Sequence, residues 1–272
     1  MKGCALAIAA LLLVALAPAG ARGHTQQAPP ADVGIDQHLG AAVPLDLPFR
    51  NEMGETVTLG AAMQAKPTVL ALVYYKCTML CPLLLDGMVR ALKQISFDAG
   101  REFQVIVVSI APRETPVLAM MKKRETLSRY PRRGADQGWA FLTGEEASIR
   151  ALTGAVGFRY SYDAKADEYA HPAGLVLLTP GGKVARYFYG IEFSPRDLRL
   201  GLVEAADERI GSPVDQVLLL CYHYDPLTGK YGFAIMSALR LAGAVTVLCL
   251  GVFMVIMFRR ERGSRDASAG RT

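Results

Sequence analysis

The stretch that decides the fold is Val69-Leu70-Ala71-Leu72-Val73-Tyr74-Tyr75, followed one residue later by Cys77-Thr78-Met79-Leu80-Cys81-Pro82. Its first part is short, apolar and rich in β-branched and aromatic residues, which is typical of a buried strand. After Cys81 apolar residues recur every three or four positions, which predicts a helix over residues 82–97. The two thiols therefore lie at a strand-to-helix turn, where backbone N–H groups favour thiolate over thiol.

The sequence on both sides of this turn predicts an α/β domain over residues 44–210. Strands and hairpins are expected at 48–57, 103–110, 139–142, 173–179 and 183–189, and further helices at 116–130, after a capping box at 143–146, and at 195–209. Parallel crossovers come early in this order and an antiparallel hairpin comes late. The pattern is that of a thioredoxin-like sandwich, with the cysteine turn at its redox position.

The amino-terminal segment resembles an export signal. Lys2 precedes an apolar run, and the small residues 19–21 offer a cleavage site after Ala21. Residues 1–21 are therefore expected to be a signal peptide, and Cys4 inside it is given no role. Residues 22–43, which contain Gln26-Gln27-Ala28-Pro29-Pro30, are expected to form a flexible tether.

The carboxy-terminal segment predicts a single membrane span. Residues 241–258 carry no charge, and as a helix at roughly 1.5 Å per residue they would extend about 27 Å. Arginines follow at once, which places the tail inside the cell by the positive-inside rule. We expect a juxtamembrane segment at 211–232, a transmembrane helix at 233–258 and a cytoplasmic tail at 259–272. The protein would then be a single-pass protein of the bacterial cytoplasmic (inner) membrane, with its domain facing the periplasm.

The charge and the cysteine count exclude two classes of protein. The formal net charge is +5, but much of it comes from the arginines of the tail, so the exported domain is close to neutral and nucleic-acid binding has no support. The exported part contains three cysteines, Cys77, Cys81 and Cys221. An odd number in an oxidising compartment leaves at least one thiol unpaired or metal-bound, which excludes a disulfide scaffold.

Two cysteines four positions apart can be a structural disulfide, a redox dithiol or metal ligands. The disulfide would close too small a loop to stabilise much, so redox or metal chemistry is favoured. A third ligand is available in His171, on the loop that enters the late hairpin. Two thiolates and one imidazole suit Cu(I) well and also accommodate Cu(II), whereas structural zinc would need a fourth ligand.

Three blocks of the sequence together resemble the Sco/SenC family. They are Tyr75-Lys76-Cys77-x-x-x-Cys81-Pro82, then Val108-Ser109-Ile110-Ala111-Pro112-Arg113-Glu114-Thr115-Pro116, and the distant His171. The resemblance implies a membrane-anchored, thioredoxin-fold copper protein that assembles the copper-A centre of cytochrome c oxidase. It also implies that Cys77, Cys81 and His171 are the copper ligands and that the two cysteines form the redox dithiol.

The sequence departs from the family pattern in three ways. The residues between the cysteines, Thr78-Met79-Leu80, are largely apolar, Ala111 stands where an aspartate is usual, and the membrane anchor is carboxy-terminal. Met79 is the methionine considered as a weak axial contact to the metal. Cys221 and His223, two positions apart, offer an accessory metal site, or else a buried cysteine within a tyrosine-rich membrane collar.

Two functions are expected from these features. The first is a copper chaperone that delivers copper to the copper-A subunit of cytochrome c oxidase, with another copper chaperone or a thiol reductant as a further partner. The second is a membrane-tethered thiol–disulfide reductase that keeps the oxidase cysteines reduced. Only the second function, that of a thiol–disulfide reductase, would make the protein an enzyme.

Overall fold

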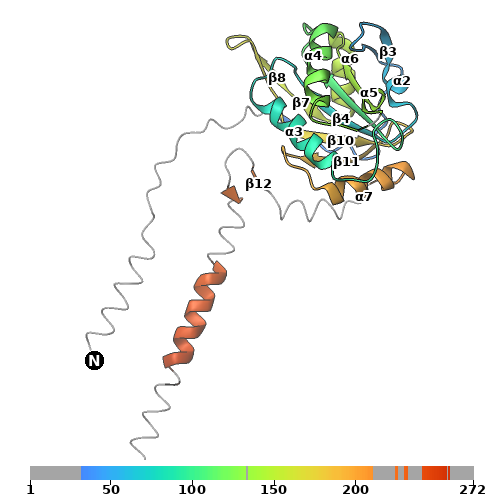
Figure 1. Cartoon of the computed structure of the whole chain (residues 1–272). Coiled ribbons are helices and arrows are strands. Elements are labelled where there is room, and N and C mark those ends of the chain that lie inside the picture. The colour runs from blue at the N-terminus through green and yellow to red at the C-terminus, as the bar shows by residue number, and fades with distance from the viewer. Residues whose placement is uncertain are drawn as a thin grey trace, which may run out of the picture.

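The structure is a computed structural model, and most of the residues that it describes form one α/β domain (Figure 1). The described residues are 32–132, 134–210, 224–225, 230–231, 241–255 and 257. The expected signal peptide, most of the juxtamembrane segment, the first part of the expected span and the tail lie outside these residues.

The domain is built on one mixed five-stranded sheet. Its strands lie in the order β11-β10-β4-β5-β6, with bounds β4 Thr68–Val73, β5 Gln104–Ser109, β6 Trp139–Leu142, β10 Gly174–Leu178 and β11 Val184–Tyr189. Strands β4, β5 and β6 are parallel, whereas β10 pairs antiparallel with both β4 and β11. Every residue of β4 and β5 is buried, as their continuous apolar runs predict. The early parallel crossovers and the late hairpin are confirmed.

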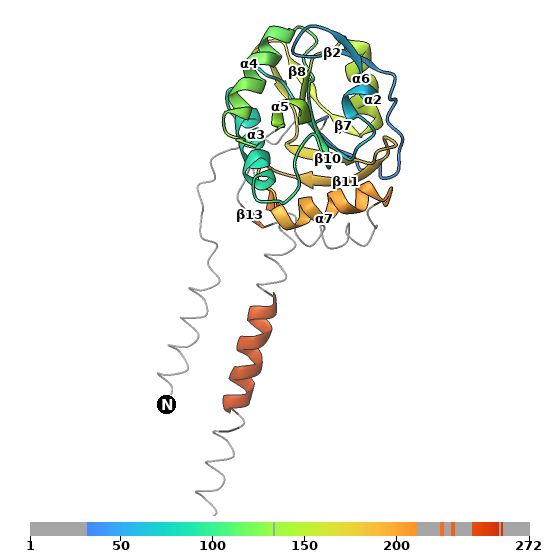
Figure 2. The ribbon, with the colours of Figure 1, turned by 45° about the vertical axis from the view of Figure 1, so that its right-hand side comes forward.

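Helices cover both faces of the sheet. Their bounds are α2 Leu59–Met63, α3 Leu80–Leu92, α4 Pro116–Leu127, α5 Ala135–Gly138, α6 Glu146–Ala155 and α7 Pro195–Ala206. Right-handed connections place α3 and α4 on the same face, because each joins a strand to its next parallel neighbour. Figure 2 shows α3 and α4 on one side of the sheet and α2 and α6 on the other, and α7 packs beside α3.

Short β-strands lie outside the central sheet. They are β1 Gly34–Ile35, β2 Pro48–Arg50, β3 Thr56–Thr58, β7 Phe158–Arg159, β8 Ser161–Asp163, β9 Glu168–Ala170, β12 Tyr224–Asp225 and β13 Lys230–Tyr231. The hairpin of β2 and β3 is confirmed, with its turn held by Asn51, whose Oδ1 accepts hydrogen bonds from the amides of Met53 and Glu55.

Three local expectations were wrong. The helix after the cysteines ends at Leu92 rather than near residue 97, and the guanidinium of Arg132 donates to the carbonyls of the turn that follows, those of Lys93, Ile95 and Phe97. Thr143 does not form a capping box, because it pairs with the backbone of Arg50 instead.

The third difference concerns the expected tether at 22–43. Its carboxy-terminal part is packed on the domain, with β1 paired to β7 and Val43 buried. A pairing of two residues has no periodicity that a sequence pattern could show.

Residues 241–255 form a helix whose apolar side chains are exposed. Among the residues that the structure describes, no helix has both the length and the apolar character that crossing a membrane requires.

Helix α3 crosses the chain after β11 so closely that it requires a glycine. A Cβ at Gly87 would overlap the carbonyl oxygen of Ile191, so Gly87→Ala should lower the free energy of unfolding by roughly 1–3 kcal/mol, the usual cost of overpacking. Gly154 in α6 is the matched control, since a Cβ there would meet no described heavy atom within 4 Å. Gly154→Ala should gain up to about 1 kcal/mol from helix propensity. Equilibrium denaturant unfolding of both variants checks this, and a neutral Gly87→Ala would contradict the packing.

Candidate metal centre

The two cysteines lie where β4 passes into α3. The amide of Cys77 donates to the carbonyl of Tyr74 at 3.2 Å, which turns the chain immediately after the strand. Cys81 is the second residue of α3, so both sulfurs lie beside the first turn of the helix. The strand-to-helix placement expected from the sequence is confirmed.

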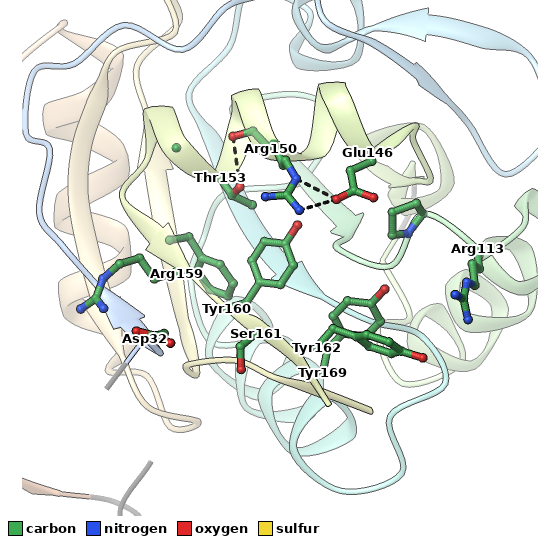
Figure 3. A pocket seen from close by; sticks show the side chains of 13 residues that line it. Asp32, Arg113, Glu146, Arg150, Thr153, Arg159, Tyr160, Ser161, Tyr162 and Tyr169 are labelled. Atoms are coloured by element: carbon green, nitrogen blue, oxygen red, sulfur yellow. Dashed lines mark hydrogen bonds and ion pairs between the residues drawn. The ribbon is translucent and has the colours of Figure 1, made fainter. Parts of the chain in front are cut away.

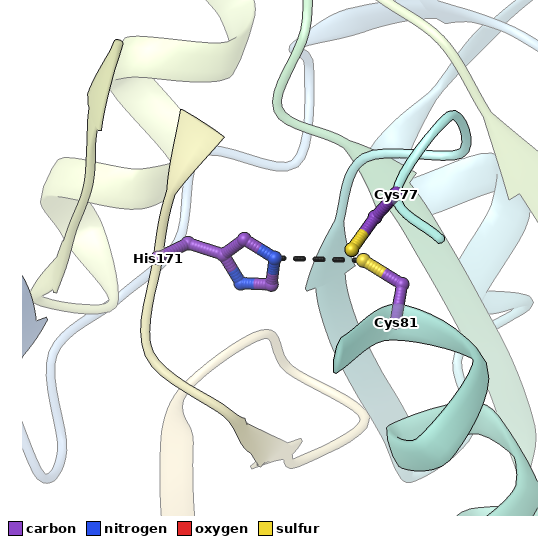
Figure 4. Close-up of side chains that lie close together, drawn as sticks. All are labelled: Cys77, Cys81 and His171. Carbon is purple, nitrogen blue, oxygen red and sulfur yellow. Dashed lines mark hydrogen bonds between the residues drawn. The ribbon is translucent and has the colours of Figure 1, made fainter. Parts of the chain in front are cut away.

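His171 reaches this turn from the other end of the sequence. It lies between β9 and β10, and because β10 runs antiparallel to β4, the start of β10 meets the end of β4. Its Nε2 is 3.4 Å from the sulfur of Cys81, and the three potential ligand atoms lie within 4.8 Å of one another (Figure 4). The exposed fractions of Cys77, Cys81 and His171 are 9%, 1% and 8%.

The imidazole is held by its second nitrogen and by aromatic rings. Nδ1 of His171 lies 3.0 Å from the carbonyl oxygen of Pro172, a contact that suits an Nδ1–H donor and leaves Nε2 free as a ligand. Tyr74 meets the imidazole edge-on at 5.8 Å between ring centroids, and Phe158 lies at 6.2 Å. Tyr169 packs on Tyr74 in turn, so the far side of the imidazole is closed by a wall of aromatic rings.

A buried carboxylate fixes the chain just before Cys77. Glu114 accepts hydrogen bonds from the amides of Tyr75 and Lys76 at 2.7 and 2.8 Å and from the hydroxyl of Ser109 at 2.6 Å. It is 7% exposed. In the sequence Ala111 stands where the family resemblance implies an aspartate, and no pattern marks Glu114, three positions on, as the carboxylate that supports the cysteine turn.

The thiols differ in their affinity for a proton. Hydrogen bonding to the thiol of Cys81, and to backbone amides at the start of α3, holds the pKa of Cys77 well below its ordinary value. The pKa of Cys81 is raised, because Cys81 donates to Cys77 and is itself buried. In the metal-free pair these two shifts favour a thiolate on Cys77 and a proton on Cys81.

This asymmetry predicts how reduced, metal-free protein reacts with iodoacetamide. An ordinary thiol loses about tenfold in rate for each pH unit below its pKa near 8.5, whereas Cys77 should stay thiolate and react at a nearly constant rate from pH 8 to pH 5. Mass spectrometry of quenched samples measures the rate at each cysteine, and the denatured protein is the control. A tenfold loss per pH unit at Cys77 would contradict the assignment.

The other candidate ligands are placed as follows. Met79 is 77% exposed, in contrast to the buried cysteines and His171. Cys221 and His223 lie outside the described residues. Cys249 is a free, exposed cysteine in the helix over 241–255. Within the described parts of the chain, the group of Cys77, Cys81 and His171 is the one cluster of this kind that could hold a metal ion.

The fold and the site together define a class of protein, a thioredoxin-like domain with two thiols and an imidazole at its redox turn. The family model described as SCO1/SenC matches residues 40–204. The chain belongs to the SCO1/SenC family.

Two solved structures share the fold, and a third is less similar. A putative electron transfer protein from Aquifex aeolicus VF5 is 23% identical with a TM-score of 0.55, covering 62% of this chain and 95% of its own. A putative electron transport protein from the same organism is 24% identical with a TM-score of 0.52, covering 62% and 99%. Arabidopsis thaliana ScoI with copper bound is 20% identical with a TM-score of 0.49, covering 60% and 96%. No match was found among curated proteins.

Proposed function

We propose that this protein binds copper through Cys77, Cys81 and His171 and delivers it to the copper-A subunit of cytochrome c oxidase during assembly. The observation that carries the proposal is the convergence of two sulfurs and one imidazole nitrogen within 4.8 Å, in a member of the SCO1/SenC family. The similar ScoI structures from Arabidopsis thaliana and Bradyrhizobium japonicum are described with copper bound.

The donor atoms fit copper by type and by spacing. Thiolate sulfur and imidazole nitrogen are soft or intermediate ligands, which suit Cu(I) and also bind Cu(II). Three ligands at metal distances of about 2.0–2.3 Å lie roughly 4 Å apart around one ion, so the observed spacing needs little adjustment. No carboxylate belongs to the cluster, which disfavours Mg²⁺ and Ca²⁺.

Ligand exchange explains how copper would leave. Cys77 is more exposed than Cys81 and lies in the loop before the helix, so a thiolate of the acceptor can replace it first. Cys81 and His171 then hold the ion until the acceptor supplies further ligands. Because the raised pKa of Cys81 favours its protonated form in the metal-free pair, loading with copper releases a proton.

The proposed place of action is the periplasmic face of the bacterial cytoplasmic membrane. The helix over 241–255 exposes large apolar side chains, including Leu248, Phe253 and Val255, and a surface of that kind has no stabilising environment in water. Arginines 259, 260 and 262 follow it in sequence. We place the domain outside the cell, anchored by the segment 233–258 after cleavage of the signal 1–21. Cys221 and His223 would then lie near the membrane surface as an accessory metal pair.

A second function is favoured by the thiol pair itself. Cys77 and Cys81 are both free thiols, and a thiolate beside a protonated partner is the arrangement that attacks a disulfide and then resolves the mixed disulfide. The domain would then be a reductase for the cysteines of the oxidase subunit. This reaction needs the two cysteines but not His171.

Membranes from cells lacking the protein distinguish the two functions. Copper delivery predicts low copper-A content and low oxidase activity, both restored by added copper. The reductase function predicts restoration by a membrane-permeable thiol reductant, without added copper. Normal copper-A content in the deletion strain would contradict both.

A further inference from the structure

A pocket of about 660 Å³ lies directly behind the aromatic wall of the metal centre. Helix α6 forms one side, and the strand from Phe158 through Tyr160 to Tyr162 forms the floor (Figure 3). Phe158 and Tyr169 belong both to the pocket and to the wall around His171. Figure 3 shows Asp32 at one end of the pocket and Arg113 at the other, with the tyrosines between them.

The amino-terminal segment enters the domain at this pocket. In the antiparallel pairing of β1 with β7, Gly34 faces Arg159 and Ile35 faces Phe158. Continued upstream in the same register, Asp32 would face Ser161, and both residues do line the pocket. The residues before Asp32 would then run beside β8, which among the described strands pairs with β9 alone, so its other edge is open.

We propose that the segment Ala28-Pro29-Pro30-Ala31 of this same chain occupies the pocket, running from Asp32 along β8 toward Arg113. The proposal rests on the register, on the position of Asp32, and on the length of the segment. Four extended residues cover about 13 Å at 3.1–3.3 Å per residue. This assignment does not depend on copper binding.

The chemistry of the pocket suits this occupant. Proline-rich segments adopt the extended polyproline conformation before binding, so they lose little entropy when they pack on aromatic grooves. Tyr160, Tyr162 and Tyr169 supply the rings, with Tyr162 40% exposed. Proline lacks an N–H donor and is therefore tolerated along the open edge of a strand.

The amino-terminal segment is joined covalently to β1, so even a weak contact with the pocket is enough to keep it docked there. A segment joined directly to its site experiences an effective concentration in the millimolar range. Docking there would add an outer layer behind Phe158 and Tyr169, so the amino-terminal segment would shield the side of the metal centre that faces away from the cysteine loop.

Photocrosslinking of the full-length protein in detergent micelles tests the proposal. The photoreactive amino acid p-benzoylphenylalanine replaces Tyr162, and in a second protein Arg113, which lies at the far end of the pocket and is also exposed. After irradiation and proteolysis, we expect mass spectrometry to find an intramolecular crosslink to residues 26–31 from both positions. The same amino acid at Val117 on α4, which is 69% exposed and does not line the pocket, is the control and should not form that crosslink.

A second variant separates docking from chance contact. Replacing Pro29 and Pro30 by glycine keeps the length of the segment but removes the preformed conformation, and should abolish the crosslink. Undiminished crosslinking in that variant, or crosslinks from position 162 that go only to other parts of the chain or to another protein, would overturn the proposal. A cooperative denaturant-unfolding transition like that of the wild type shows that the domain of each crosslinker protein is folded.

Discussion

Cys81→Ser is expected to lower the copper affinity of the protein at least about 100-fold, beyond the 10–100-fold that loss of a second-shell contact costs. Cys81 is almost fully buried, and its sulfur is the one that lies next to Nε2 of His171. Serine keeps nearly the same volume but offers a hard, protonated oxygen, which is a poor ligand for Cu(I). Cys77→Ser should have an effect of similar size.

Competition titration with a copper-binding chromophore measures this loss. Cys249→Ser is the matched control, since Cys249 is a free cysteine in the separate helix over 241–255. It should leave copper affinity unchanged. If Cys81→Ser and Cys249→Ser bind copper equally well, the thiols of the turn do not hold the metal.

Glu114→Ala is expected to have the largest effect on stability. It would leave the amides of Tyr75 and Lys76 and the hydroxyl of Ser109 without their acceptor. A buried donor left unpaired costs about 1–3 kcal/mol, so the free energy of unfolding should fall by roughly 3–5 kcal/mol. Glu114→Gln keeps one acceptor oxygen and should cost about half as much.

Denaturant unfolding measures both variants against Glu125→Ala. Glu125 lies on α4 and makes exposed ion pairs with Lys122 and Arg129, which are worth less than about 1 kcal/mol each. Equal stability of Glu114→Ala and Glu125→Ala would contradict the supporting role of Glu114. Because the amide of Lys76 immediately precedes Cys77, a folded Glu114 variant should also show weaker copper binding.

The sequence predicts those parts of the fold that have strong local patterns. The runs that became β4 and β5 are continuous and apolar, and α4 and α7 begin at Pro116 and Pro195, the first residues of their expected ranges. Short pairings such as β1 with β7 depend on contacts between distant residues, so no local pattern reveals them. Thr143 does not cap α6 as its sequence context predicts, because its backbone pairs with that of Arg50.

The cluster of Cys77, Cys81 and His171 was predictable from the sequence, but its surroundings were not. The spacing of Cys77 and Cys81 is visible in the sequence, and the position of His171 on the loop before the late hairpin made it the candidate third ligand. Glu114 lies in a polar, proline-containing turn that resembles an exposed loop, and its burial depends on how β5 meets the end of β4. Phe158 and Tyr169 have no distinguishing sequence pattern, because only the arrangement of β7 and β9 brings them to the imidazole.

The most direct test of the three-ligand site is a copper titration of His171→Ala beside His38→Ala. His38 is the matched control, because its ring contacts the backbone of Ala155 and is not part of the cluster. The wild type and His38→Ala should show the intense thiolate-to-copper absorption of the Cu(II) form, and His171→Ala should lose that absorption and bind copper more weakly. Unchanged stoichiometry, affinity and absorption in His171→Ala would contradict the site proposed for this protein.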